Sequence, residues 1–234
     1  MGQIEVIESN GRRIVKKKYS SEPGLVKWFI IKSLSLPLQI YPYTLSSRER
    51  MKREIEFFQE KPGGVYTPSV IEVDWENLVL YREYVDGEPM VPGITIDKIK
   101  CVADALYSIH SSGYCMGDSK HNNFLYAGDD RVYVIDAEQS TRCKRDYMKA
   151  WDLIVFITTI IYALGFAKGL KSVCSAEEIL CYIKNFIDKY VDRGGCQYVS
   201  EIDSNTRLKT LAQILLPPPY SIKFIQYVKE SVKK

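Results

Sequence analysis

The sequence predicts an α+β fold in two lobes, with a small β-rich amino-terminal lobe over residues 1–86 and a helical carboxy-terminal lobe over residues 87–234. Segments with strand-like alternation gather in the first lobe, whereas apolar residues in the second recur with a period near 3.6, which is typical of helices. Asp86-Gly87 is turn chemistry and marks the break between the two patterns. At 234 residues with 46% hydrophobic residues, the chain is long enough to bury a sizeable core.

Two β-hairpins are predicted in the small lobe. Asn10-Gly11 separates the first pair of strand-like segments, and both residues tolerate the positive φ that a tight turn requires. A turn over residues 74–77 separates the second pair. The predicted strands are residues 4–7 and 13–16 in the first hairpin, and residues 68–73 and 78–85 in the second.

A helix is predicted between the two hairpins. Ser46 and Glu49 stand at the spacing of a capping box, in which each side chain bonds the backbone N–H of the other residue. The helix is expected to end near Gln59, because Pro62 and the glycines after it do not continue a helix. Residues 20–43 show neither helical nor strand periodicity, so no element is predicted there.

Helices account for most of the second lobe. One runs from about Thr95 to Ser112, where Gly113 ends it. Ser175 and Glu178 form another capping box, which opens a second helix. That helix is expected to reach about Val191, where Gly194-Gly195 stops it. Other helices are predicted over residues 207–215 and 222–232.

The most apolar window, residues 153–167, is interrupted by Thr158, Thr159 and Gly165. It is shorter than the roughly 18 residues that a membrane span requires. A buried helix is therefore predicted here, and no contact with a membrane is expected.

The functional signal lies in the stretch that ends at Asp136. Asp118 is followed five residues later by Asn123, and a predicted hairpin over residues 124–135 returns Asp136 toward Asp118. Phosphoryl transfer from ATP requires a carboxylate to orient the attacking hydroxyl and oxygen ligands for a divalent metal. Because Mg²⁺ prefers such oxygen ligands, Asn123 and Asp136 are predicted to hold Mg²⁺.

The segments MGDSKHNNFL and VIDAEQ resemble the catalytic and metal-binding loops of atypical protein kinases, above all the Bud-type kinase of the KEOPS complex and the RIO kinases. Upstream, RRIVKKKY resembles the strand that carries the nucleotide-binding lysine in these kinases, and RMKREIEFF resembles the helix that donates a glutamate. The resemblance covers roughly residues 2–156. It implies a bilobal protein kinase-like fold with a reduced amino-terminal lobe.

The resemblance implies a role for each matched residue. Asp118 would orient the hydroxyl proton, and Lys120 would neutralise the transferring phosphoryl group. Lys16 would bind the phosphates of ATP in an ion pair with Glu54. Strand alternation favours Lys16 on the cleft face, whereas a shift by one residue would place Lys17 there.

The same resemblance extends to positions around the loops. The backbone from Glu83 to Val85 would hydrogen-bond adenine, with Arg82 at the deep end of this hinge. Asp152 would brace the backbone of the catalytic loop. His110 is expected to be a structural hydrogen-bonding residue.

The charge and the cysteine content of the chain indicate which partners and which cellular location to expect. A net charge of +3 and a pI of about 8.4 are too mild to indicate direct nucleic-acid binding, so ATP and a protein substrate or partner are expected. The six cysteines lack the spacing of metal ligands, and they predict reduced thiols in a cytoplasmic protein.

These features together predict an atypical ATP-dependent serine/threonine protein kinase. The short connection between Asp136 and Asp152 leaves no room for an activation segment, so a folded protein substrate is expected. Two alternatives remain open. A small-molecule phosphotransferase of the aminoglycoside or sugar kinase type uses a similar loop, and a pseudokinase would act as a binding module through a partner.

Overall fold

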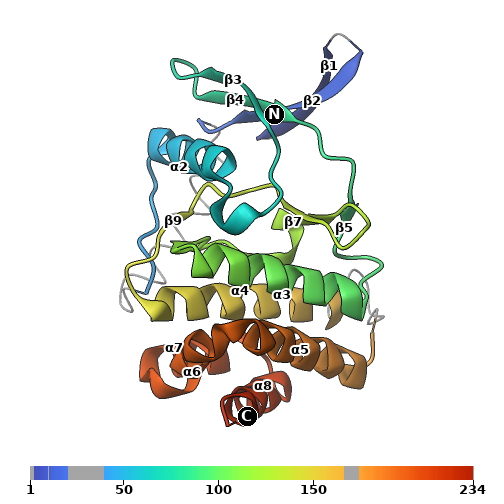
Figure 1. Cartoon of the computed structure of the whole chain (residues 1–234), viewed down its shortest axis with the longest axis vertical. Coiled ribbons are helices and arrows are strands. Elements are labelled where there is room, and N and C mark those ends of the chain that lie inside the picture. The colour runs from blue at the N-terminus through green and yellow to red at the C-terminus, as the bar shows by residue number, and fades with distance from the viewer. Residues whose placement is uncertain (1–2, 10, 21–39, 166–173, 234) are drawn as a thin grey trace.

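The structure, a computed structural model, describes residues 3–9, 11–20, 40–165 and 174–233. It confirms the α+β class. Figure 1 shows a β-sheet and one helix, α2, at one end of the molecule, and a stack of helices at the other, with short strands between them. Residues 21–39, most of the segment without a predicted element, lie outside the described residues, and the division at residue 86 stays a prediction.

The sheet is antiparallel, with strand order β1-β2-β4-β3. Its strands are β1 (Ile4–Ser9), β2 (Arg12–Lys18), β3 (Val70–Asp74) and β4 (Val79–Glu83). Both predicted hairpins are confirmed, and Gly11 has the positive φ, 71°, that its turn requires. Strands β2 and β4 are the central pair. In their register, Val15 of β2 lies opposite Arg82 of β4.

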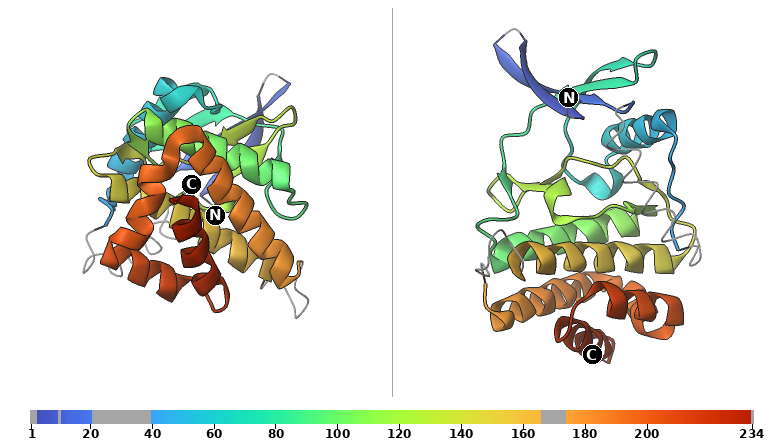
Figure 2. Two further views of the ribbon diagram at one scale, coloured as in Figure 1. Left: turned by 60° about the horizontal axis from the view of Figure 1, so that its bottom comes forward. Right: turned by 180° about the vertical axis from the view of Figure 1, so that it is seen from behind.

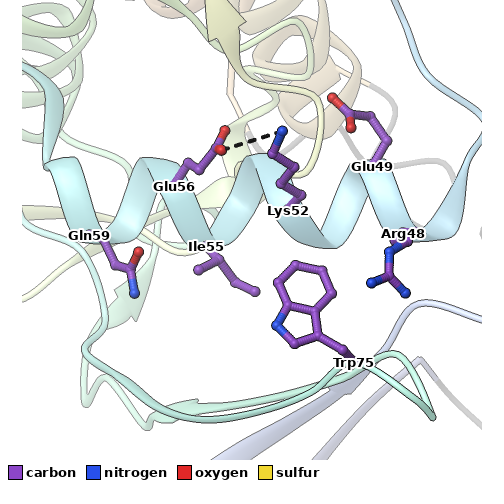
Figure 3. Close-up of a pocket in the computed structure, with 7 residues that line it drawn as sticks. All are labelled: Arg48, Glu49, Lys52, Ile55, Glu56, Gln59 and Trp75. Atoms are coloured by element: carbon purple, nitrogen blue, oxygen red, sulfur yellow. Dashed lines mark ion pairs between the residues drawn. The ribbon is translucent and has the colours of Figure 1, made fainter.

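Helix α2 (Ser47–Glu60) lies between this sheet and the helical stack. The Ser46 side chain accepts a hydrogen bond from Glu49 N, which confirms the predicted helix start. Figure 3 shows Trp75, from the turn between β3 and β4, beside Ile55 and Arg48 on the outer face of α2. The Arg48 guanidinium lies 5.2 Å from the centre of the Trp75 ring, so this contact links α2 to the sheet edge.

The stack contains six described α-helices. They are α3 (Ile96–Ser111), α4 (Asp146–Gly165), α5 (Ala176–Tyr190), α6 (Cys196–Ser204), α7 (Thr206–Leu215) and α8 (Tyr220–Ser231). Figure 2 shows α5 to α8 together at the end farthest from the sheet. The capping box of Ser175 and Glu178 is present as predicted.

Helix α6 was not predicted from the sequence. Gly194-Gly195 was expected to end the preceding helix, but the chain passes through a π-helical turn, Val191–Gly195, and continues as α6. Gly194 takes φ 104°, a conformation that redirects the chain without ending the helical segment.

Helix α4 is 20 residues long, and its length and mean hydropathy of 1.5 would allow it to cross a membrane. In this structure 61% of its apolar window is buried. Its neighbours include α5, α6 and α7. The core helix of a soluble protein meets the same criterion of length and composition, so α4 is weak evidence for a membrane span.

Short strands fill the space between sheet and helices: β5 (Glu88–Pro89), β6 (Tyr114–Cys115), β7 (Phe124–Tyr126), β8 (Val132–Val134) and β9 (Thr141–Arg142). The β7–β8 hairpin is the one predicted before Asp136. Phe124 of β7 packs edge-on against Phe156 of α4, and Phe156 stacks on Phe186 of α5 with 4.8 Å between ring centres. These buried rings fix the hairpin to the helical core.

A disulfide joins Cys115 in β6 to Cys143, just after β9, with 5.4 Å between their Cα atoms. The expectation of reduced thiols is therefore wrong for this pair, because the β6–β9 pairing brings two distant cysteines together. Within the described residues the other cysteines are free. The loop that the disulfide closes contains both segments that carry the predicted catalytic and metal-binding residues.

We predict that replacing Cys115 and Cys143 together by serine lowers the free energy of unfolding by about 3–4 kcal/mol, because a cross-link across roughly 28 residues restricts the unfolded chain by that amount. Urea unfolding under non-reducing conditions measures the difference. The matched control is Cys181→Ser, which changes an exposed free thiol. An unchanged unfolding midpoint in the double variant would contradict the prediction.

Candidate active site

Lys17 is the centre of the site. Its Nζ lies 2.6 Å from Glu54 Oε2 and 3.0 Å from Asp136 Oδ1, and its side chain is only 1% exposed. Glu138 Oε2 is 3.5 Å away. Strand β2, helix α2 and the loop after β8 therefore meet at one buried ammonium group.

The predicted ion pair between Lys16 and Glu54 is wrong by one residue. Lys16 is half-buried and lies opposite Glu5 and Tyr81 in the sheet, whereas Lys17 faces Glu54. Side chains alternate along a strand, so a shift by one residue exchanges the two faces. The alternative assignment, which placed Lys17 on the cleft face, matches the observed contact between Lys17 and Glu54.

Helix α2 contributes two charged side chains to the site. Glu54 is fully buried and also accepts a hydrogen bond from the Tyr19 hydroxyl. Arg50, one turn earlier, is fully buried too, and it donates to Glu138 Oε2 at 3.2 Å and to Tyr19 O at 2.8 Å. Neither Arg50 nor Glu138 was predicted from the sequence. The spacing of four residues places Arg50 on the same helix face as Glu54, which was the available signal for Arg50.

Burial and mutual contact set the charges in this cluster. Burial by itself would lower the pKa of Lys17, but Asp136, Glu54 and Glu138 outweigh it and raise that pKa, so Lys17 stays cationic. Burial raises the pKa of Glu54 to about 7, and Lys17 opposes this shift while Asp136 and Glu138 add to it. Glu54 thus keeps its proton to a higher pH than an ordinary glutamate does.

The three carboxyl groups also form a set of oxygen donors. One oxygen from each of Glu54, Asp136 and Glu138 lies within 4.8 Å of the other two, and Glu54 Oε1 is buried without a hydrogen-bond partner in the described residues. Carboxylate oxygens suit Mg²⁺ and similar hard cations. The three carboxylates therefore offer oxygen donors of the type that a divalent metal needs, and in this structure Lys17 Nζ lies within 3.5 Å of all three.

The loop that carries Asp118 is held by its own contacts. Asp118 Oδ2 lies 2.6 Å from Lys120 Nζ, and Asn123 donates from Nδ2 to the backbone oxygen of Asp118 at 2.6 Å. This leaves Oδ1 as the end of the Asn123 amide that can bind a cation. The backbone of Asn123 accepts a hydrogen bond from Ile135 N, which joins the Asp118 loop to the segment that ends in Asp136.

Asp152 braces this loop from α4, as predicted. Its carboxylate accepts hydrogen bonds of 2.7 Å from the backbone nitrogens of Met116 and Gly117, immediately before Asp118. His110 lies between Asp152 and the Tyr190 hydroxyl and is fully buried, which confirms its structural role. Two backbone donors and a buried ring thus fix the approach to Asp118.

On the side of the Asp118 loop opposite Asp152, close packing requires a glycine at position 117. Its φ is 72°, and a Cβ at this position would come within 2.2 Å of the Tyr41 ring. The Tyr43 hydroxyl donates to Gly117 O at 2.7 Å. Tyr41 and Tyr43, which precede α2, therefore hold the Asp118 loop in place from outside.

The residues after Asp136 connect the site to α2. Gln139 pairs with the backbone of Thr44 through two hydrogen bonds of 3.0 Å, with Thr44 N donating to its Oε1 and its Nε2 donating to Thr44 O. Ser140 donates to Arg53 O. Together with the Arg50–Glu138 contact, these bonds fix the position of α2 relative to Asp136.

The predicted hinge, residues 83–85, begins at the last residue of β4. The backbone N–H of Glu83 donates to Ser69 O, and the Glu83 carboxylate accepts from Ser69 N. Val85 is buried just beyond. The role of Glu83 and Val85 in binding adenine stays a prediction.

No protein-family model matches the chain. It is 28% identical over 123 residues to a probable bifunctional tRNA threonylcarbamoyladenosine biosynthesis protein from Methanothermobacter thermautotrophicus, which covers 52% of this chain and 22% of that protein. Proteins of the same name from Methanosarcina acetivorans and Methanosarcina mazei are 33% and 34% identical over 90 residues, covering 38% of this chain and 16% of each protein. The match thus spans 22% or less of the length of these curated relatives.

The raised pKa of Glu54 predicts a pH-dependent stability. Between its unfolded pKa of about 4.5 and its folded pKa of about 7, the folded chain holds a proton that the unfolded chain has lost. The stabilising contribution of Glu54 is therefore present below about pH 4.5 and is lost as the pH rises through about 7. Glu54→Gln cannot titrate, so wild type should lose roughly 1–3 kcal/mol relative to this variant between about pH 5 and pH 8.

Urea unfolding at these two pH values, without divalent metal or nucleotide, measures this difference. Glu56→Gln on the exposed face of α2 is the matched control and should show no such change. The raised pKa of Glu54 would be contradicted if the difference in free energy of unfolding between wild type and Glu54→Gln were the same at both pH values. It would also be contradicted if wild type gained stability relative to the variant as the pH rises.

Proposed function

We propose that the chain is an atypical Mg²⁺-ATP-dependent phosphotransferase that transfers the γ-phosphoryl group to a serine or threonine hydroxyl of a protein. The observation that carries the proposal is the buried Lys17, which contacts Glu54 of α2 and Asp136 of the loop after β8 at the same time. A lysine that is held in this way offers a fixed cation to nucleotide phosphates. Preorganised charge of this kind is the main means of catalysing phosphoryl transfer.

Asp118 and Lys120 would act on the transferred group. Asp118 would accept or orient the proton of the attacking hydroxyl, and Lys120, which contacts Asp118 at 2.6 Å, would neutralise the charge of the phosphoryl group. The brace from Asp152 supports this role, because a general base must be held within hydrogen-bond reach of its proton.

Asn123 and Asp136 would hold Mg²⁺, with Glu138 as a third oxygen donor close to Asp136. When bound, the metal neutralises charge on the phosphates. Within the chain, Glu54 would keep Lys17 directed toward the nucleotide phosphates.

The substrate is proposed to be a folded protein. Only a short segment joins Asp136 to α4, and its β9 strand is paired with β6, so it offers no long loop for a peptide. The relatives are named for tRNA threonylcarbamoyladenosine biosynthesis, which extends the proposed partners to tRNA-modifying proteins and tRNA. The expectation that the chain binds no nucleic acid has no support from these relatives, and a cytoplasmic location stays a prediction.

Lys17→Met is predicted to lower kcat/KM for phosphoryl transfer by about 100-fold or more, because it removes the cation that meets the phosphates. Lys16→Met, the adjacent lysine on the opposite face of β2, should change it less than about threefold. Initial rates of transfer measure both, and circular dichroism verifies that each variant is folded. Equal losses in the two variants would contradict the assignment of Lys17.

The proposed function is tested with Mg²⁺ and ATP labelled in its γ-phosphate. The full chain is incubated alone, with a general protein substrate, or with an aminoglycoside and a sugar, and Asp118→Asn is the control of matched size. Label on protein that is absent in Asp118→Asn is the expected result. Label on small molecules alone would favour the small-molecule phosphotransferase, and nucleotide binding without any transfer would favour the pseudokinase.

A further inference from the structure

Arg82 is a buried arginine that makes no direct ion pair in the described residues, although its charge acts on the buried Glu54 carboxyl group and opposes the rise of the Glu54 pKa. Its residue is 4% exposed, and among the described residues its guanidinium makes one side-chain hydrogen bond, from Nη1 to Glu83 O at 3.3 Å. Its Nε is buried and has no partner in that part of the chain. A guanidinium carries five N–H donors, so most of its hydrogen-bonding capacity is not used by the described residues.

The other buried cations of this region behave differently. Lys17 contacts three carboxylates, and Arg50 contacts Glu138 as well as a backbone oxygen. Arg82 interacts with Glu54 only through its charge, so most of its N–H donors have no hydrogen-bond acceptor in the described part of the chain. Burying such donors without acceptors destabilises the fold, and a bound ligand with acceptor atoms would satisfy them.

The sheet register shows where such an acceptor would lie. Val15 of β2 is directly opposite Arg82 of β4, and residues that face each other in an antiparallel pair project from the same side of the sheet. Lys17 is two residues beyond Val15 on β2 and projects from that side too. The Arg82 guanidinium, which lies 6.0 Å from the centre of the Phe58 ring of α2, thus shares the face of the sheet on which Lys17 meets Glu54.

This position is next to the proposed site of the nucleotide base. The base would bind along the segment from Glu83 to Val85, one residue after Arg82, while Lys17 would meet the phosphates. Glu83 O, the nearest hinge acceptor, already receives a hydrogen bond from Arg82. An exocyclic amino group, as in adenine, would compete for this oxygen and would face guanidinium donors. An exocyclic carbonyl, as in guanine, would accept from them.

We propose that Arg82 selects the nucleotide by its base and favours purines with a carbonyl at position 6, so that GTP serves as phosphoryl donor at least as well as ATP. This inference rests on the proposed function and names the donor for the same site. Arg82 acts as a specificity-determining residue.

The test measures the affinity of the full chain for ATP, GTP and ITP by calorimetry in Mg²⁺, followed by transfer from the γ-labelled form of each. ITP has the 6-carbonyl of GTP without its 2-amino group, so it isolates the contact assigned to Arg82. Wild type should bind GTP and ITP at least as tightly as ATP. Arg82→Met should weaken GTP and ITP relative to ATP by about tenfold or more, because a charge-assisted hydrogen bond is lost.

Arg82→Gln repeats the test should Arg82→Met fail to fold, and thermal unfolding verifies both. Arg48→Met, an exposed arginine on the outer face of α2, is the control and should leave the ratio unchanged. Tighter binding of ATP than ITP, with a ratio that the Arg82 variants do not change, would overturn the inference and leave the proposed function intact. Absence of binding and transfer with every nucleotide would overturn both.

Discussion

A buried lysine that must remain charged is the constraint on which the site depends. Lys17 has almost no contact with solvent, and an isolated ammonium group in such a position would lose its proton or destabilise the fold. Glu54, Asp136 and Glu138 prevent this, and they come from positions 37 and more residues away along the chain. Placing Lys17 therefore also places helix α2 and the segment after β8.

The same network explains how α2 keeps its position without a long regulatory loop. Arg50 joins α2 to Glu138, and Gln139 joins the chain before α2 to the same segment through two hydrogen bonds. On the other side, Asp152 fixes the backbone before Asp118. Both halves of the site are held by buried polar contacts. Such contacts are costly when a single member is removed, so they favour one arrangement.

Local signals were enough to predict most elements of the fold. Ser46 and Ser175 mark helix starts because capping is a local interaction, and Asn10-Gly11 marks a hairpin for the same reason. The spacing of Asp118, Asn123 and Asp136 predicted one shared loop region, and the Ile135–Asn123 backbone contact joins its parts. Helix α6 was missed because a glycine pair was taken as a stop, although a π-helical turn carries the chain through it.

Features that depend on contacts between distant segments could not be predicted from local patterns. The choice of Lys16 assumed that Ile14 marks the inner face of β2, yet the inner face carries Val15, Lys17 and Tyr19. Tyr19 was the available clue. Alternation places Ile14, Lys16 and Lys18 on one face, which would bury two lysines, whereas the other face carries Val15, Lys17 and Tyr19 and buries only one. The contact of Glu138 with Arg50 and the disulfide between Cys115 and Cys143 both join segments that are distant in sequence, and the disulfide depends on the β6–β9 pairing.

The central claim is that Asp136 belongs to a metal–nucleotide site beside Lys17. Electron paramagnetic resonance of Mn²⁺ with a non-hydrolysable nucleoside triphosphate tests it most directly. The account predicts Mn²⁺ binding that requires the nucleotide and is lost in Asp136→Asn; equal Mn²⁺ binding in wild type and Asp136→Asn would contradict it.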